Sequence, residues 1–301
     1  YTSYYLYKEY LHTSCHGFVF LGFLDYTALM YFKNKTVLIT GASRGIGKAI
    51  ALKLASEGAN IVIAAKSTTE DARLGGTIFS TAKEVEAAGG KALAVFCDIR
   101  DEKLIQELME KTFRAFGSLD ILVNNASAIN LGNTTQLEPK RFDLLFDINV
   151  RGTYLMTKFA YPLLKVSVNP HILTLSPPLD LDMKWFKPHL AYTMSKYNMS
   201  LMAMAWAEEF KKDGIASNTL WPATTIATAA VKNLLGGEEL VRRSRRPEIV
   251  ADAAFYILQQ DAKTNSGNAY LDEEVLRTAG ITDLEHYAIS PGGPLQTDLF
   301  L

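Results

Sequence analysis

From Lys35 onward, short apolar runs alternate with longer segments in which apolar residues recur at helical spacing. Several of the short runs are continuously apolar, as is typical of parallel strands that are buried on both faces. Strands that alternate with helices indicate βαβ units, and these predict an α/β domain with a doubly wound parallel sheet. The predicted strands are Thr36–Thr40, Asn60–Ala65, Ala92–Phe96, Ile121–Asn124, His171–Leu175, Ile215–Leu220 and Asn268–Leu271.

Helical periodicity is clearest after the first predicted strand. There Ile46, Ile50 and Leu54 recur every four residues, and Gly58 supplies a stop. Because no internal repeat interrupts the pattern, we predict a single domain over residues 34–301. Further helices are predicted over Phe79–Ala88, Glu102–Phe116, Lys140–Tyr161, Tyr192–Lys211 and Pro247–Gln259.

Residues 1–33 do not follow this pattern. They are rich in aromatic residues, and their apolar stretch from Phe18 to Phe32 is interrupted by Asp25. That stretch is too short to span a bilayer, and it has neither the basic start nor the cleavage site of a signal peptide. We interpret residues 1–33 as an extension outside the core, even an artefact of the gene model, with a membrane or partner contact as the alternative. The Pro- and Gly-rich end Pro291–Leu301 resembles an interdomain linker and carries no targeting signal, so the chain could be a piece of a longer protein.

Composition narrows the function classes. The 301 residues are 48% hydrophobic with a formal net charge of −1, which argues against a nucleic-acid surface. The two cysteines, Cys15 and Cys97, are too few for a disulfide framework and indicate a reducing intracellular compartment. Neither lies in metal-ligand spacing with a histidine, so no metal site is predicted.

A glycine-rich turn lies between the first strand and the first helix. In Thr40–Gly47, Gly41 permits a tight turn, Gly45 lets the backbone approach a phosphate, and Gly47 allows close packing of helix on strand. Unpaired N–H groups at the helix start would bind the pyrophosphate of a nucleotide. The alternative is a turn without a ligand. The predicted cofactor contacts here are Gly41, Ser43, Arg44, Gly45, Ile46 and Gly47.

The end of the second strand bears on the type of nucleotide. An acidic residue about 20 residues beyond the glycines would bind the ribose 2′-hydroxyl of NAD, but this place holds Lys66 after Ala65. Lys66 and Arg44 could hold a 2′-phosphate, which favours NADP(H) over NAD(H); solvated loop charges are the alternative. Asp98, after the third strand, could accept from the adenine amino group or merely cap a helix.

Tyr192 and Lys196 lie four residues apart, which places both on one face of a helix. An ammonium group beside a phenol favours the phenolate and so lowers the pKa of the tyrosine. Such a tyrosine can act as a general acid or base on a carbonyl or alcohol. Together with the glycine turn, this pair predicts a carbonyl–alcohol oxidoreductase.

Four motifs occur in an order that resembles the short-chain dehydrogenase/reductase superfamily over nearly all of residues 34–260. They are Thr40–Gly47, Asn124–Ala126, Asn149 within Asp147–Gly152, and Tyr192 with Lys196. Other stretches are similar to the hydroxysteroid dehydrogenase-like branch of that superfamily, in which a sterol-carrier-type domain, absent from these 301 residues, follows the reductase domain. They are Gly58–Lys66, Ser176–Leu179, Trp185–Lys187 and Tyr287–Gly292.

The resemblance implies a Rossmann-type fold of about seven strands and roles for several residues. Tyr192 would protonate the alkoxide that hydride transfer from NADPH forms, and in oxidation it would be the base. Lys196 would lower the pKa of Tyr192 and hold the nicotinamide ribose. Asn149 would position a water between Lys196 and solvent, with a helix-surface or capping amide as the alternative, and Asn125 would line the cofactor cleft.

The resemblance further implies a homo-oligomer, built on the helices Lys140–Tyr161 and Tyr192–Lys211, and a role in peroxisomal or mitochondrial lipid metabolism. Between Thr224 and Arg246 it implies a mobile substrate lid. An apolar small-molecule substrate follows from this context. The aromatic residues Trp185 and Phe186, with His189, could line its pocket or belong to the core.

Two departures from the superfamily pattern bear on catalysis. Where a second serine usually binds the substrate carbonyl, this chain has Pro177 after Ser176. Ser176 could take over that role, or it could satisfy local backbone; loss of an oxyanion donor can cost about 10²–10³ in rate. In the loop after the sixth strand, Ala223 replaces a usual glycine, so the loop could differ and the threonine that contacts the nicotinamide is not identified.

Two functions remain open from the sequence. The first is an NADP(H)-dependent oxidoreductase that acts on a lipid-derived carbonyl or alcohol, with Tyr192, Lys196, Asn149 and Ser176 as its catalytic residues. The second is a nucleotide-binding regulator or lipid-handling protein whose catalysis has lapsed, which Pro177 and Ala223 favour.

Overall fold

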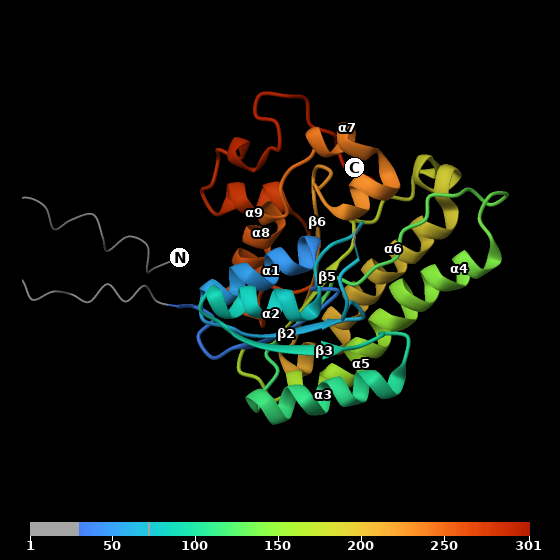
Figure 1. Ribbon diagram of the computed structural model, residues 1–301. Coiled ribbons are helices and arrows are strands. Elements are labelled where there is room, and N and C mark those ends of the chain that lie inside the picture. Colours follow the sequence, from blue (N-terminus) through green and yellow to red (C-terminus); the bar gives the residue numbers. More distant parts are fainter. Residues whose placement is uncertain (1–29, 72) are drawn as a thin grey trace, which may run out of the picture. The chain divides into compact units, whose positions relative to one another are not determined.

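Seven parallel strands form one sheet in the order β3-β2-β1-β4-β5-β6-β7 (Figure 1). The computed structural model describes residues 30–71 and 73–301. The order reverses direction between β1 and β4, as in doubly wound sheets, and ligands bind such sheets at the carboxyl ends beside that reversal. The strands are β1 (Thr36–Thr40), β2 (Asn60–Ala65), β3 (Lys91–Phe96), β4 (Ile121–Asn124), β5 (His171–Leu175), β6 (Ala216–Trp221) and β7 (Ala269–Leu271).

Helices connect the strands and cover both faces of the sheet. The α-helices are α1 (Gly45–Ser56), α2 (Ile78–Ala87), α3 (Glu102–Phe116), α4 (Pro139–Leu145), α5 (Thr153–Leu164), α6 (Met183–Glu209), α7 (Gly237–Arg242), α8 (Glu248–Leu258) and α9 (Asp272–Thr278). Two π-helices, η1 (Phe146–Gly152) and η3 (Val231–Leu235), and two 3₁₀ turns, η2 (Lys211–Asp213) and η4 (Glu285–Tyr287), complete the described elements.

The core has two layers, one on each face of the sheet. Side chains of α1 and α8, such as Leu54 and Ile257, pack on one face with Ile39 of β1. Side chains of α3 and α5, such as Leu108 and Met156, pack on the other. Figure 1 shows α1 and α2 on one side of β2 and β3, with α3 and α5 on the other. The predicted doubly wound α/β fold is therefore confirmed.

One predicted helix is divided in the structure. Lys140–Tyr161 was expected to be continuous, but α4 passes into the π-helix η1 at Phe146 before α5 begins at Thr153. A π segment inserts wider backbone turns, and such segments are frequent at functional sites. Here the segment contains Asn149. The division therefore falls on a residue that the sequence assigned to the site.

The start of the domain lies slightly earlier than residue 34. The compact unit begins at Tyr31, and Phe32 is 2% exposed in the core, where its ring lies 5.7 Å from that of Phe255. Residues 31–33 therefore belong with the domain. The rest of the predicted extension, up to residue 29, lies outside the described residues.

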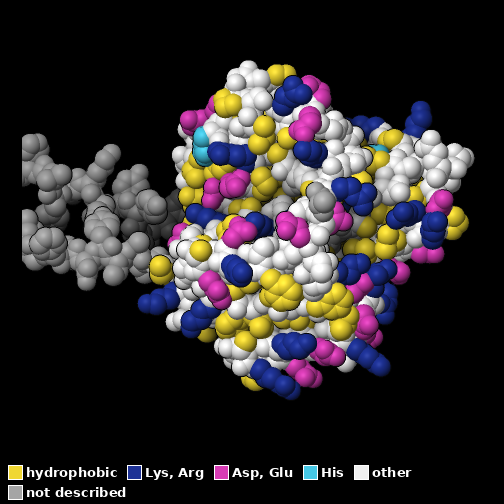
Figure 2. All heavy atoms as spheres, viewed as in Figure 1, with side chains coloured by type: hydrophobic (Ala, Val, Ile, Leu, Met, Phe, Trp, Pro, Cys, Tyr) yellow, Lys and Arg dark blue, Asp and Glu magenta, His cyan; other side chains and the backbone are white. Residues whose placement is uncertain are grey.

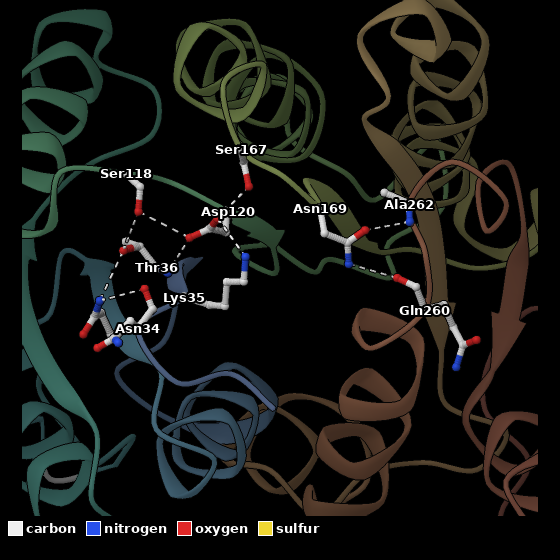
Figure 3. Close-up of polar contacts among 10 residues, drawn as sticks. Asn34, Lys35, Thr36, Ser118, Asp120, Ser167, Asn169, Gln260 and Ala262 are labelled. Carbon is white, nitrogen blue, oxygen red and sulfur yellow. Dashed lines mark hydrogen bonds and ion pairs between the residues drawn. The ribbon is translucent and has the colours of Figure 1, made fainter. Parts of the chain in front are cut away.

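The amino ends of the strands are held by a polar network around Asp120 (Figure 3). Its carboxylate accepts from the backbone N–H of Thr36 at 2.9 Å and from the hydroxyl of Ser167 at 2.5 Å. Lys35 lies 3.6 Å from the same carboxylate. Nearby, the side chain of Asn169 bonds the backbone of Gln260 and Ala262. This network ties β1, β4 and the loop before β5 together at the edge opposite to the carboxyl ends.

The surface carries charges of both signs. On the face in Figure 2, lysine and arginine side chains lie interspersed with acidic ones. No described helix is long and apolar enough to cross a membrane. Within residues 30–71 and 73–301, no three His, Cys, Asp or Glu side chains gather as they would to hold a metal ion.

Candidate functional site

A cavity of about 390 Å³ opens at the carboxyl ends of β1 to β4. Because the chain reverses its strand order there, the position is the one at which doubly wound sheets bind nucleotides. Most of the predicted cofactor contacts line this cavity: Gly41, Ser43, Arg44, Gly45, Ile46, Lys66, Asp98 and Asn125. Gly47 lies behind the turn. Tyr192 and Lys196 are not among the lining residues.

The glycine turn has the backbone that its residues predict. Gly41 and Gly45 have φ of 67° and 57°, in the left-handed region that favours glycine. At Gly47, a Cβ would lie 2.9 Å from the carbonyl oxygen of Gly41 and would collide with the amide nitrogen of Asn125. The turn therefore requires glycine for packing at one position and for conformation at two. The helix α1 starts at Gly45, with its N–H groups at the cavity.

Thr40 and Asn125 join the glycine turn to the end of β4. The Thr40 hydroxyl accepts from the backbone N–H groups of Asn125 and Ala126, both at 3.0 Å. The Asn125 amide donates in return to the carbonyl oxygen of Thr40 at 2.8 Å. Asn125 therefore shapes the wall of the cavity. The sequence placed Thr40 only in the glycine turn. In the structure its hydroxyl also fixes the backbone after β4.

Charged side chains lie at the outer end of the cavity. Arg44 donates to the Ser67 hydroxyl at 2.8 Å and to the Gly76 carbonyl at 3.0 Å, and its Nε is buried without a partner among the described residues. Lys66 lies 3.4 Å from the carboxylate of Asp98. The two cations that the sequence predicted to hold a 2′-phosphate, Arg44 and Lys66, thus both line the cavity.

Asp98 does not cap the following helix. Asp101 caps α3, so the capping alternative for Asp98 is wrong. Instead, the carboxylate of Asp98 accepts from Arg100 at 3.0 Å. The hydrogen bond from Arg100 is the main cause that lowers the pKa of Asp98 to about 2. Asp98 therefore presents a charged acceptor to the cavity.

Tyr192 and Lys196 lie on the buried face of α6, after a kink at His189. Lys196 is 2% exposed and Tyr192 is 5% exposed. The Lys196 ammonium donates to the carbonyl oxygen of Leu175, at the end of β5, at 2.5 Å. Within the described part of the chain, the Tyr192 hydroxyl forms no hydrogen bond of its own. The hydrogen-bonding capacity of this hydroxyl is therefore unused among the described residues.

The expected lowering of the Tyr192 pKa is absent from this arrangement. Burial raises the pKa of Tyr192, and the charge of Asp298 adds to this effect. Burial also lowers the pKa of Lys196 to about 7, against a smaller opposing effect of Asp298. Burial thus disfavours the charged form of both groups. The ammonium can lower the pKa of the tyrosine only once the surroundings of the pair change.

Asn149 connects the π-helix η1 to α6. Its amide oxygen accepts from the backbone N–H of Ala128 at 2.7 Å, and its amide nitrogen donates to the Ser195 hydroxyl at 2.9 Å. Ser195 in turn donates to the carbonyl oxygen of Tyr192 at 2.8 Å. The side chain is fully buried, so the alternative of a helix-surface amide is wrong. Asn149 fixes the backbone that carries Tyr192, a relation that the spacing did not reveal.

Ser176 and Pro177 follow the end of β5. The Ser176 hydroxyl is fully buried and has no hydrogen-bond partner among the described residues. Ser176 therefore does not form the local backbone hydrogen bond that the second interpretation of this residue predicted. Pro177 has no N–H or side-chain donor. Its carbonyl accepts from Ser200 at 2.6 Å.

The loop after β6 accommodates Ala223 without strain. Ala223 is not among the residues with positive φ, and its N–H donates to Asp272 at 2.8 Å. The replacement of the usual glycine therefore does not spoil the loop. Thr224, Thr225 and Thr228 follow Ala223, and of these Thr228 lines the cavity. Thr225 instead bonds the hydroxyl of Ser244 at 2.8 Å.

An aromatic group around Tyr192 was only partly foreseen. Phe300 lies at its centre, 2% exposed. The sequence offered Trp185, Phe186 and His189 as a pocket wall, but it gave no sign that Phe300 would enter. The described aromatic rings within about 6 Å of the Phe300 ring are those of Trp185, His189, Tyr192, Tyr197 and Trp221.

Known proteins share most of this sequence and fold. Residues 35–238 match the family described as short chain dehydrogenase. Hydroxysteroid dehydrogenase-like protein 2 of Xenopus laevis is 55% identical over 266 residues, which are 88% of this chain and 63% of that protein. The chain therefore spans less than two thirds of the length of that relative.

Solved structures extend the likeness to three dimensions. A short chain dehydrogenase from Mycobacterium thermoresistibile is 51% identical, with a TM-score of 0.85 over 90% of this chain and 96% of that one. A metagenomic short-chain oxidoreductase in complex with NADP is 25% identical, with a TM-score of 0.65 over 80% of this chain and 97% of that one.

Proposed function

The chain belongs to the short-chain dehydrogenase/reductase family, and we propose that it transfers hydride between NADP(H) and a lipid-derived carbonyl or alcohol. One observation carries the proposal. The free hydroxyl of Tyr192 and the ammonium of Lys196 lie on α6, close to the end of β5, at the same sheet edge as the cavity that the glycine turn lines. A nucleotide bound in the cavity would therefore lie at the same edge of the sheet as the proposed acid/base pair.

The residues present fit a nicotinamide dinucleotide. The glycines leave room where a Cβ would collide, and the start of α1 presents N–H groups to phosphate. Arg44 and Lys66 would bind a 2′-phosphate, which supports NADP(H) over NAD(H). When bound, the cofactor supplies or accepts the hydride. The related metagenomic oxidoreductase was solved with NADP, which is consistent with the assignment.

The acid/base chemistry falls to Tyr192. In reduction its hydroxyl donates a proton to the forming alkoxide, and in oxidation its phenolate accepts the alcohol proton. Lys196 would turn from the Leu175 carbonyl toward the ribose and the phenol, and its positive charge would then stabilise the phenolate. Asn149, through Ser195, holds the backbone of Tyr192 in place during this change.

The aromatic and aliphatic side chains around Tyr192 support an apolar substrate. Trp185, Leu145 and Trp221 pack in the same cluster as Tyr192. With Pro177 in place of a serine donor, we propose that Ser176, whose buried hydroxyl has no described partner, bonds the substrate oxygen. Location in the peroxisome or mitochondrion stays a prediction from the family resemblance.

The test is the turnover rate of a variant that lacks the Tyr192 hydroxyl. Tyr192→Phe should bind NADPH like the wild type and lose at least about 10²-fold in kcat on a panel of lipid-derived aldehydes, ketones and alcohols. Tyr197→Phe is the matched control, because that hydroxyl lies in the same cluster but donates to the Asp180 carbonyl. Undiminished turnover by Tyr192→Phe would refute the proposed role.

Lapsed catalysis is the second candidate. Pro177 removes a donor, and burial raises the pKa of Tyr192. This function predicts that the wild type binds NADPH tightly and turns over no member of the panel. Robust turnover of any lipid-derived substrate would exclude it.

A further inference from the structure

We propose that residues 296–301 are an internal ligand of the substrate site, which must leave before the nicotinamide end of the cofactor and the substrate can reach Tyr192 and Lys196. The proposal rests on the function proposed above. It assigns to this pocket a second ligand, an acidic and aromatic peptide segment of this same chain, of sequence Gln-Thr-Asp-Leu-Phe-Leu.

The Phe300 side chain fills the space beside the proposed acid/base. Its ring centroid lies 6.1 Å from that of Tyr192, at an interplanar angle of 32°. The rings of Tyr197 and Trp221 lie 5.3 Å and 5.8 Å from it. Leu299 and Leu301 pack against the same cluster. A phenyl ring surrounded in this way excludes any other apolar group from the pocket.

Backbone hydrogen bonds hold the segment along its length. Gln296 donates to the carbonyl of Arg243 at 2.8 Å and accepts from the N–H of Thr225 at 2.9 Å. The indole N–H of Trp221 donates to the carbonyl of Leu299 at 2.9 Å. In Figure 1 the C-terminus lies beside α7, which agrees with the bond to Arg243 at the end of that helix. The segment is therefore docked by specific contacts as well as by its apolar side chains.

Two features of the docked segment oppose docking. Phe300 has φ of 76°, a left-handed backbone conformation that bulky residues rarely adopt. The carboxyl of Asp298 is withdrawn from water, and Asp272 is another carboxyl that interacts with it. Conformational strain and the burial of a carboxyl group make the segment easier to displace than its apolar contacts alone would suggest.

The docked segment explains why the pair on α6 does not line the cavity. Lys196 and Tyr192 are almost fully buried, although the proposed chemistry requires contact with the ribose and the substrate. The open cavity extends from the glycine turn to Lys66 and Asp98, which is the region proposed above for the adenosine and phosphates. A nucleotide without nicotinamide can therefore bind with the segment docked. A complete dinucleotide must displace it, and its apparent affinity falls in proportion to the fraction of molecules that are open.

The experiment compares these two classes of probe on three proteins: the wild type, Phe300→Ala and Phe32→Ala. The fragment is 2′,5′-ADP, the dinucleotide is NADPH, and titration calorimetry measures both. Phe32→Ala is the matched control, because it removes an equally buried phenyl ring from the opposite end of the domain core. Hydrogen exchange of the amides of residues 296–299 reports docking directly, with and without NADPH.

The expected result is a gain in affinity for NADPH alone. Phe300→Ala should bind NADPH at least about tenfold more tightly than the wild type, since loss of a buried phenyl ring strongly weakens docking. The affinity for 2′,5′-ADP should not change, and Phe32→Ala should show no gain. In the wild type, NADPH should accelerate exchange of the segment amides, whereas 2′,5′-ADP should not.

Failure of this inference and failure of the proposed function give different results. If 2′,5′-ADP binds all three proteins but Phe300→Ala brings no selective gain for NADPH, the inference about the segment is wrong and the nucleotide site stands. Segment amides that stay protected in saturating NADPH would lead to the same conclusion. If neither probe binds any of the proteins, the proposed function itself is wrong, and the inference falls with it.

Discussion

The ammonium of Lys196 donates to the carbonyl oxygen of Leu175, at the end of β5, and not to the phenol of Tyr192 one turn before it. Residues four apart on one helix face are close enough to interact, so spacing alone made that pairing reasonable. The strand end supplies a stronger acceptor in a site from which water is excluded. Under the proposed function, the chemistry of the pair requires the release of the ammonium from the strand.

We expect Lys196 to make stability depend on pH. Burial lowers its pKa from 10.5 to about 7, so between these values the unfolded chain binds a proton that the folded chain does not. The free energy of unfolding should therefore rise as the pH increases from about 7 to about 10.5, and the contribution of Lys196 should be lost as the pH falls. Lys196→Met should remove this pH-dependent rise in the free energy of unfolding, which is on the order of a few kcal/mol. Urea unfolding across this pH range measures it.

The exposed Lys83 of α2 provides the control for this titration. Lys83→Met should retain the full rise in unfolding free energy of the wild type. A Lys196→Met variant with the same pH profile as the wild type would show that the ammonium is not withdrawn from water in the folded protein.

Lys66 should set the choice between the two nicotinamide dinucleotides. Its ammonium lies 3.4 Å from Asp98 and about half exposed at the cavity, so a 2′-phosphate could attract it away from that carboxylate. Lys66→Asp should weaken NADPH binding by about 10- to 100-fold, because a charge-assisted contact becomes a repulsion. NADH binding should be unchanged or tighter. Fluorescence titration with both dinucleotides measures the ratio.

Lys91→Asp makes the same change of charge at the exposed start of β3, at the opposite edge of the sheet. It should leave the ratio of the two affinities unaltered. If Lys66→Asp weakened both dinucleotides equally, the residue would contribute only a general charge, and the preference for NADP(H) would lose its support.

The strands were predictable from sequence because each is a buried apolar run between turn residues. Thr36–Thr40 and His171–Leu175 begin and end where the pattern placed them. The division of Lys140–Tyr161 was not predictable, since Asn149 bonds Ala128, which lies on a distant loop. Hydrophobic periodicity contains no information about such a contact. A tertiary hydrogen bond lies within the π segment there.

The sequence predicted the parts of the candidate site that depend on a residue's own backbone conformation, as at Gly41 and Gly45. The sequence did not predict the parts that depend on a contact between residues far apart in the chain. Phe300 is an example, because it lies about a hundred residues beyond Tyr192 in the chain and in a stretch that reads as a linker. Nothing in the local pattern indicates that such a residue returns to the active site. Hydrogen bonds to Trp221 at the end of β6 and to the loop after it hold the segment there.

Asp120 should contribute to stability without taking part in the chemistry. Its carboxylate accepts from the N–H of Thr36 and from the hydroxyls of Ser118 and Ser167 at the amino ends of the strands. Asp120→Ala should lower the free energy of unfolding by about 2–4 kcal/mol, because a buried N–H group would lose its partner. Urea unfolding measures the loss. NADPH affinity of the folded fraction should stay at the wild-type value.

Asp143, an exposed residue of α4, provides the comparison. Asp143→Ala should change the unfolding free energy by less than about 0.5 kcal/mol. An equal effect of the two substitutions would mean that the network around Asp120 adds nothing beyond an ordinary surface charge.

Docking of residues 296–301 should weaken as the pH rises. Burial raises the pKa of Asp298 from 3.8 to about 7, so the docked segment holds a proton that a released one would lose. Docking is favoured most below pH 3.8, and it is weakened progressively up to about pH 7. Exchange protection of the segment amides, corrected for intrinsic rates, should therefore be greater at about pH 5 than at about pH 8.

Asp298→Asn separates this titration from those of its neighbours. Lys196 and Asp272 face Asp298 and have pKa values of about 7 and about 6, so both change charge in the same range. If Asp298 is the group responsible, the amide side chain should keep the segment equally protected at both pH values, because it has no proton to lose. A dependence on pH that persists in Asp298→Asn would assign the effect to Lys196 or Asp272. In that case the carboxyl of Asp298 would not govern release of the segment.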